Sequence, residues 1–153
     1  MPGFELFSDA ERKEVHDVLD SGVLMRYGFD GMRNGHWKAK ELERALEAQF
    51  DVKHAQLLSS GTAAVSVALA ITGIGAGDEV IMPTFTFVAS FEAIMMLGAI
   101  PVLVDIDDTL TLDPEAVRNA ITPKTKAIMF VSSNGRYPSS GIDAFLSLCE
   151  KYD

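Results

Sequence analysis

The most informative part of the sequence is the run Leu57-Leu58-Ser59-Ser60-Gly61-Thr62-Ala63-Ala64. It predicts a short apolar strand that turns sharply into an apolar helix. The first N–H groups of such a helix have no partner inside it and carry its positive end, so a phosphate group fits there. Gly61 lets an anion approach the backbone, and the Ser60 and Thr62 hydroxyls add donors. The same residues also fit an ordinary helix cap, and the residue types leave both interpretations open.

The segments that follow alternate between strand and helix patterns. Helical patterns cover residues 62–72, 88–97 and 114–120, and short apolar runs begin near His54, Glu79, Ile100 and Lys126. This spacing is typical of βαβ units, so the sequence predicts an α/β fold with a mostly parallel sheet and flanking helices. The helix at residues 62–72 is apolar nearly all round, as a buried helix would be.

Two helices and a loop are expected before this region. Ser8 and Glu11 have the spacing of a capping box for the first helix, and residues 37–50 have the pattern of an amphipathic helix that packs on a core. Residues 22–35 are rich in glycine and include Arg26 and Arg33, which indicates an irregular loop. Long loops are often functional.

Composition excludes several classes of protein. With 48% hydrophobic and 23% charged residues, the chain should fold, and residues 1–153 are expected to form a single domain. A net charge of -9 argues against non-specific binding of nucleic acid. One cysteine, no membrane-spanning run and no export signal favour the cytoplasm. The histidines lack ligand spacing, so no metal site is expected.

Two aromatic side chains stand at the end of the predicted strand that begins near Glu79. The stretch reads Pro83-Thr84-Phe85-Thr86-Phe87. Open α/β sheets place their ligands at the carboxyl edge, where one ring could stack on a planar cofactor. Core packing of both rings is the alternative. The nearby run of residues 73–78 looks like a dinucleotide fingerprint, but it follows a helix and precedes a strand, so we interpret it as a helix C-cap and turn.

A competing function is suggested by Asp105-Ile106-Asp107-Asp108-Thr109 at the end of an apolar run. The pattern resembles magnesium-dependent phosphatases of the haloacid dehalogenase type, in which Asp105 would be the nucleophile and Asp107 the general acid. Residues 127–134, an apolar run followed by Ser132-Ser133-Asn134, resemble that family's second motif, an apolar strand that ends in a phosphate-binding Ser or Thr. Few residues follow to supply its later lysine and carboxylates, so a strand followed by an acidic turn is the favoured interpretation.

Several motifs, taken in order, resemble the DegT/StrS family of sugar aminotransferases. They are Ser60-Gly61-Thr62-Ala63-Ala64, Gly77-Asp78-Glu79-Val80-Ile81-Met82-Pro83, Thr86-Phe87, Gly98-Ala99-Ile100-Pro101-Val102, Asp105-Ile106-Asp107, Asp113-Pro114 and the run of residues 120–128. The resemblance implies the aspartate-aminotransferase-like fold (fold type I), of which residues 1–153 would be an incomplete large domain. It also implies pyridoxal 5′-phosphate (PLP) as cofactor. The implied reaction moves an amino group from a donor such as glutamate to a keto-sugar, usually nucleotide-linked, in amino-sugar or cell-surface polysaccharide biosynthesis.

The resemblance assigns roles to four residues. It places the cofactor phosphate against the backbone of Gly61, Thr62 and Ala63, and it matches Phe87 to the aromatic residue that stacks on the pyridine ring. The family's Schiff-base lysine and its ring-nitrogen carboxylate have no match here, and residues 132–138 depart from its pattern. The chain alone is therefore expected to be inactive, with no catalytic residue assigned. A homodimer or self-association is expected, and a non-catalytic remnant is a further alternative.

Overall fold

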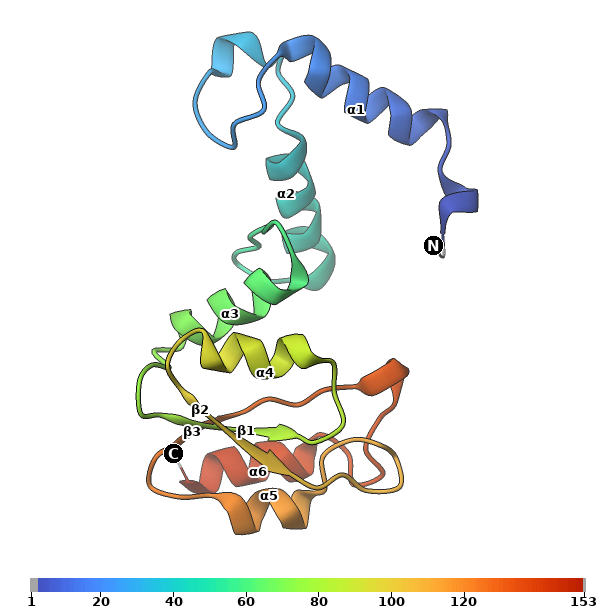
Figure 1. Cartoon of the computed structure of the whole chain (residues 1–153). Helices are drawn as coiled ribbons and strands as arrows, with labels where there is room; N and C mark the ends of the chain where they lie inside the picture. Colours follow the sequence, from blue (N-terminus) through green and yellow to red (C-terminus); the bar gives the residue numbers. More distant parts are fainter. Residues whose placement is uncertain (1–2, 153) are drawn as a thin grey trace. The chain divides into compact units, whose positions relative to one another are not determined.

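A computed structural model describes residues 3–152, and the chain divides into two compact units (Figure 1). The unit that ends at Leu57 contains two helices, α1 (Asp9–Ser21) and α2 (Lys38–Phe50), and two short 3₁₀ turns, Phe4–Leu6 and Asp30–Met32. The unit that begins at Leu58 contains the sheet. Its elements in order are α3 (Gly61–Ile71), β1 (Glu79–Pro83), α4 (Val88–Met95), β2 (Ile100–Val104), α5 (Pro114–Ala120), β3 (Thr125–Ile128), a 3₁₀ turn (Ser133–Gly135) and α6 (Asp143–Tyr152).

The sheet is parallel, as predicted, with the strand order β2-β1-β3. The central strand β1 is the most buried of the three and is covered on both faces: Val80, Ile81 and Met82 have no exposed surface. A central parallel strand needs such a continuous apolar run because helices pack on both of its sides.

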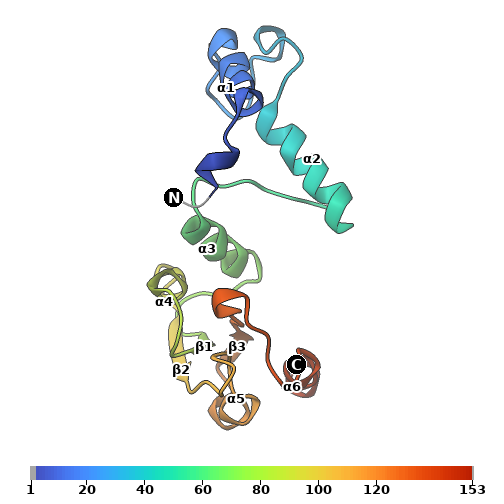
Figure 2. The same cartoon turned by 90° about the vertical axis from the view of Figure 1, so that its right-hand side faces the viewer.

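Two hydrophobic clusters lie on opposite faces of the sheet. Val80 and Met82 of β1 pack with Ile94 of α4 on one face, and Ile81 packs with residues of α5 and α6 on the other. Figure 2 shows the sheet between α4 and the pair α5 and α6. Gly98 ends the turn after α4 with a φ of +71°, and a Cβ there would lie 3.4 Å from the Ala76 Cβ. The predicted glycine stop is therefore confirmed.

Three expectations about packing and strand formation are wrong. The run that begins near His54 forms no strand; the N–H of Ala55 donates to Glu47 of α2 at 2.9 Å, so a side chain takes the place of a neighbouring strand. Helix α3 is not buried, because α4 covers that face of the sheet and α3 packs on α4; Ile71 is 80% exposed. Helix α2 likewise leaves Phe50 exposed and buries only Glu43.

Polar contacts organise the unit that ends at Leu57. The predicted capping box of Ser8 and Glu11 is present at the start of α1, and it lowers the pKa of Glu11 through the Ser8 side-chain hydrogen bond. The buried Glu43 carboxylate accepts from the Leu57 N–H at 2.7 Å and from the Arg26 guanidinium at 2.5 Å. One side chain of α2 thus fastens the loop before it and the segment after it.

No helix in residues 3–152 has the length and apolar character needed to cross a bilayer.

The Glu43 contacts make this unit sensitive to acid. The Leu57 N–H first, and Arg26 second, hold the pKa of Glu43 below the ordinary glutamate value of 4.5. A lowered folded-state pKa stabilises the fold above pH 4.5, and this contribution is lost as the pH falls through the folded-state value. We expect Glu43→Gln to lower the urea midpoint at pH 7, with the difference from wild type shrinking below pH 4.5. A difference that is constant between pH 7 and pH 3.5 would contradict the assignment.

Candidate functional site

The carboxyl edge of the sheet is where the site residues are expected to gather. The loops after β1 and β3 leave this edge for opposite faces, since the first leads to α4 and the second to α6. Such a divergence between neighbouring strands opens a crevice that ligands occupy in doubly wound sheets. In Figure 1 the amino ends of α3 and α4 lie on the side to which the β1 and β2 arrowheads point.

The first turn of α3 contains three of the predicted site residues. Ser60 is the N-cap, and its Oγ accepts the N–H of Ala63 at 3.1 Å, while the Ser60 carbonyl accepts the N–H of Ala64 at 3.0 Å. The N–H groups of Gly61 and Thr62 have no hydrogen-bond partner among the described residues. A cap and two available donors therefore exist together. The N–H of Ala63 is not available to a ligand, because it is already bonded to the Ser60 side chain.

The space around Gly61 is open. A Cβ on Gly61 would meet no atom within 4 Å, and the residue is exposed. An oxyanion can therefore approach its N–H without displacing a side chain. Thr62 is half-buried, and the Ser66 hydroxyl donates to its carbonyl at 3.0 Å. That bond leaves the Thr62 N–H unaffected.

Phe87 is the N-cap residue of α4 and is 77% exposed. Phe85 is 44% exposed, so neither ring is packed in the core, and that alternative is wrong for both. The Thr86 and Ser90 hydroxyls are hydrogen bonded at 2.9 Å and fix the start of α4. An aromatic ring in this position has a face available for a planar ligand.

Ser133 has a role at this edge that the sequence did not indicate. Its hydroxyl donates to the Phe85 carbonyl at 3.2 Å and joins the loop after β3 to the loop after β1. It therefore helps to position the segment that carries Phe87. The signal in the sequence is a polar run, residues 132–134, that follows the apolar stretch of β3 at the carboxyl edge.

The acidic run after β2 forms a turn. Asp107 Oδ1 accepts from the Thr109 N–H at 2.8 Å and also from the Thr109 hydroxyl, and Ile106 pairs with Leu112 in an antiparallel bridge. Asp105 is exposed at the end of the strand. Within residues 3–152 no three acidic, histidine or cysteine side chains are gathered as metal ligands. The predicted strand and acidic turn are thus confirmed as local structure.

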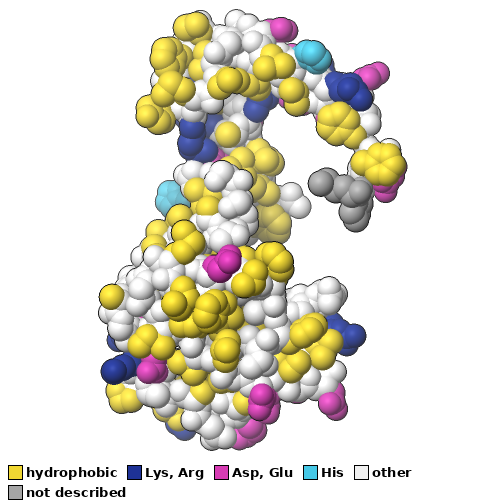
Figure 3. All heavy atoms as spheres, viewed as in Figure 1, with side chains coloured by type: hydrophobic (Ala, Val, Ile, Leu, Met, Phe, Trp, Pro, Cys, Tyr) yellow, Lys and Arg dark blue, Asp and Glu magenta, His cyan; other side chains and the backbone are white. Residues whose placement is uncertain are grey.

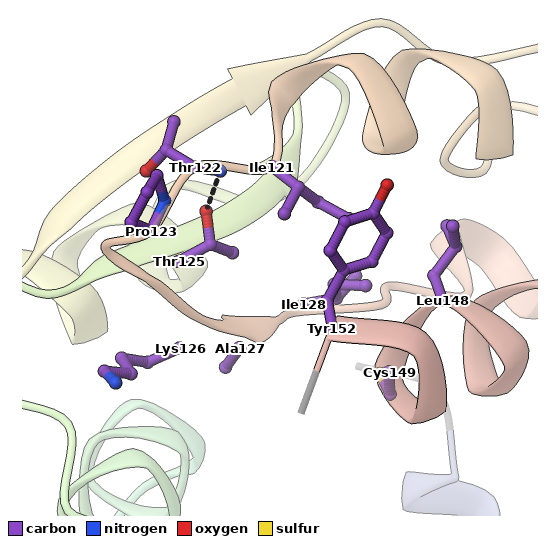
Figure 4. A pocket seen from close by; sticks show the side chains of 10 residues that line it. All are labelled: Ile121, Thr122, Pro123, Thr125, Lys126, Ala127, Ile128, Leu148, Cys149 and Tyr152. Carbon is purple, nitrogen blue, oxygen red and sulfur yellow. Dashed lines mark hydrogen bonds between the residues drawn. The ribbon is translucent and has the colours of Figure 1, made fainter.

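The lysines of this unit lie at the other edge of the sheet. Lys124 precedes β3, and its carbonyl accepts the N–H of Glu79, the first residue of β1. Lys126, in the first half of β3, lines a cavity of about 540 Å³ together with Tyr152, the last residue of α6. Lys151 precedes Tyr152 in the chain and therefore lies at this edge as well. Figure 4 shows the Lys126 side chain extending away from the Tyr152 ring. Between residues 58 and 152, then, the carboxyl edge has no lysine.

Comparisons with known proteins agree on one family. The model of the DegT/DnrJ/EryC1/StrS aminotransferase family matches residues 7–153. The chain is 41% identical over 135 residues to 3-amino-5-hydroxybenzoate synthase of Amycolatopsis mediterranei (strain S699). The matched region covers 88% of this chain and 33% of that relative. A crystal structure of a 3-amino-5-hydroxybenzoic acid synthase superposes with a TM-score of 0.83 at 38% identity, over 95% of this chain and 36% of that one.

A further solved relative bears on the cofactor. A Streptococcus pneumoniae protein described as a sugar aminotransferase has a TM-score of 0.81 at 38% identity, over 95% of this chain and 34% of that one. Its structures include a PLP form and a PMP form. The chain spans about one third of the length of each of these relatives.

Proposed function

The chain belongs to the DegT/DnrJ/EryC1/StrS aminotransferase family, and from this premise we propose that it forms the PLP-binding part of a sugar aminotransferase. The observation that supports the proposal is the first turn of α3, where the N–H groups of Gly61 and Thr62 are unbonded and reached from open space. The residues present therefore fit the phosphate of PLP, the group that this family uses.

Each residue has a separate task in this proposal. Gly61 and Thr62 bind the phosphate through their N–H groups, and the positive end of α3 adds to the attraction. Phe87 covers one face of the pyridine ring and excludes water from it, while the Ser133 hydroxyl holds the loop that carries Phe87. When bound, PLP supplies the electron sink through which an amino group is moved.

For the amino acceptor we propose a keto-sugar, usually nucleotide-linked, with glutamate as donor, in amino-sugar or cell-surface polysaccharide biosynthesis. A carbocyclic acceptor is the second candidate, because the Amycolatopsis relative is a synthase of an aminohydroxybenzoate. We propose the cytoplasm as the location.

We also propose that these residues alone do not transfer amino groups. The family's chemistry needs a lysine at the cofactor, and the lysines between residues 58 and 152 lie at the opposite edge of the sheet.

A homodimer is part of the proposal. Hydrophobic side chains that a second copy would cover are exposed over α3 and α4 (Figure 3), among them Val67, Ile71, Met95 and Met96.

Amide NMR titration tests the proposed PLP site. The probe is 4-deoxypyridoxine 5′-phosphate, which keeps the ring and the phosphate of PLP but has no aldehyde to react with surface lysines. We expect the Gly61 and Thr62 amides to shift with this probe and with inorganic phosphate, and not with deoxypyridoxine, which lacks the phosphate. The Phe87 signals should shift with both ring compounds.

Helix α5 supplies a comparison within the same unit, and the carboxylates of its first turn should repel anions. It also begins with a capped turn, in which Asp113 accepts the N–H of Glu115 at 2.9 Å. Shifts at Glu115 as large as those at Gly61 would indicate a general attraction of anions to helix ends and would overturn the proposal. So would probe-induced shifts confined to other residues.

A further inference from the structure

We propose that a cavity between α1, the loop of residues 22–36 and α2 binds a small molecule through an oxyanion, either a phosphate or a carboxylate. The cavity has a volume of about 460 Å³ and lies wholly within the unit that ends at Leu57. We call it the cationic cavity, because Arg26, Arg33, Lys38 and Lys40 line it. In a chain of net charge -9 this is a local reversal of sign.

The two carboxylates of the cationic cavity are already engaged. Glu43 binds Arg26 at 2.5 Å and the N–H of Leu57 at 2.7 Å. Asp17 binds Lys38 at 3.2 Å and Lys13, outside the cavity lining, at 2.9 Å. These contacts pair Arg26 and Lys38 with carboxylates. Lys40 is near enough to Glu43 to help lower its pKa, but Lys40 is not in contact with that carboxylate.

Arg33 and Lys40 are the two cations left over. Neither has a carboxylate within 4.0 Å in the described part of the chain. Arg33 is only 7% exposed, and its guanidinium donates to the carbonyls of Gly28, at 2.9 Å, and Met25. Carbonyls satisfy hydrogen bonds but do not cancel a full charge, and a buried charge without a counter-ion is costly. A bound oxyanion would remove that cost.

Trp37 contacts both cations. The Arg33 guanidinium lies 4.4 Å from the centroid of its ring, and the Lys40 ammonium lies 4.8 Å from the same centroid. These cation–π contacts fix both groups beside one cavity before any ligand arrives. A guanidinium and an ammonium that line the same cavity can both donate to phosphate or carboxylate oxygens.

The fluorescence of Trp37 can report on this site directly, because it is the only tryptophan in the chain. We would titrate the full chain with inorganic phosphate and, separately, with glutarate, each at constant ionic strength and pH set with sodium chloride. Saturable quenching or enhancement is expected with at least one of them. The arm that saturates at lower concentration identifies the phosphate or the carboxylate as the natural group. A signal change that stays linear in both arms would overturn the proposal.

Variants of exposed lysines separate binding in the cavity from general attraction. Lys40→Gln should raise the dissociation constant about tenfold, since a charge-assisted hydrogen bond is lost, and Lys40→Arg should keep it within a factor of three. Lys53→Gln is the matched control, because Lys53 is an exposed lysine outside the cavity lining. Equal dissociation constants for Lys40→Gln and Lys53→Gln would overturn the proposal. Arg33→Gln is avoided because this residue is buried and also holds the loop.

Discussion

Ile81→Ala is expected to lower the free energy of unfolding of the sheet-containing unit by about 2–5 kcal/mol. Ile81 lies in the central strand, has no exposed surface and packs with Val104, Leu112 and Val117. Because α5 and α6 cover this face, the structure cannot close fully around the missing methyl groups, and a cavity adds to the lost burial. Urea unfolding followed by far-ultraviolet circular dichroism measures the change. Trp37 cannot serve as the probe, since it belongs to the other unit.

Ile71→Ala is the matched control for this prediction. It removes the same atoms from a residue of α3 that is 80% exposed. Little burial is lost, and alanine favours helix, so the free energy of unfolding should stay within about 0.5 kcal/mol of wild type. The two variants are compared at a protein concentration at which sedimentation shows a monomer, because the proposed second copy would cover Ile71. Similar losses for the two variants under that condition would contradict the exposed position of Ile71 within the chain.

Gly61→Pro is expected to weaken binding of 4-deoxypyridoxine 5′-phosphate about tenfold to a hundredfold. The proline ring removes one N–H from the first turn of α3, and a hydrogen bond to a charged group contributes about 1.5–3 kcal/mol. The helix should persist, because proline is well tolerated at the first helical position. Ser60, with φ of -158° and ψ of 160°, already has the extended conformation that a following proline requires. Equilibrium dialysis measures the affinity, and circular dichroism verifies the helix.

Gly61→Ala separates the loss of the N–H from the addition of atoms. It keeps the donor, and its Cβ enters open space, so the affinity should stay within about threefold of wild type, well below the loss of a charge-assisted hydrogen bond. If both variants bound 4-deoxypyridoxine 5′-phosphate as tightly as wild type, the Gly61 N–H would have no part in binding the cofactor phosphate. If alanine weakened binding as much as proline, crowding of the ligand would explain the loss.

Much of the fold was predictable from the sequence because its signals are local. The alternation of apolar runs and helical patterns predicted β1, β2 and β3 and the helices α3, α4 and α5. Asp113 as an N-cap and the glycine stop at Gly98 were likewise predictable, since a cap depends on a few adjacent residues. The family was predictable from motifs that are weak singly but occur in a specific order, and it is confirmed.

The failures concern contacts between distant residues. The run near His54 has an apolar pattern suited to a strand, yet Glu43 and Glu47 of α2 take its N–H groups. The apolar pattern of α3 indicated burial, but whether a helix is buried depends on how much of the sheet is left for it, and α4 occupies that face. The role of Ser133 depends on a loop 48 residues away along the chain.

The sequence by itself determined the helices, the strands, their parallel arrangement and the turn at Gly61, because hydrophobic periodicity and capping act over a few residues. Only the tertiary structure decided which donors of that turn are left for a ligand, that the Phe87 ring is exposed, and that the nearby lysines lie at the far edge of the sheet. It also decided that Arg33 is buried beside Trp37 without a carboxylate. These properties depend on which groups meet in space, and no local pattern records that.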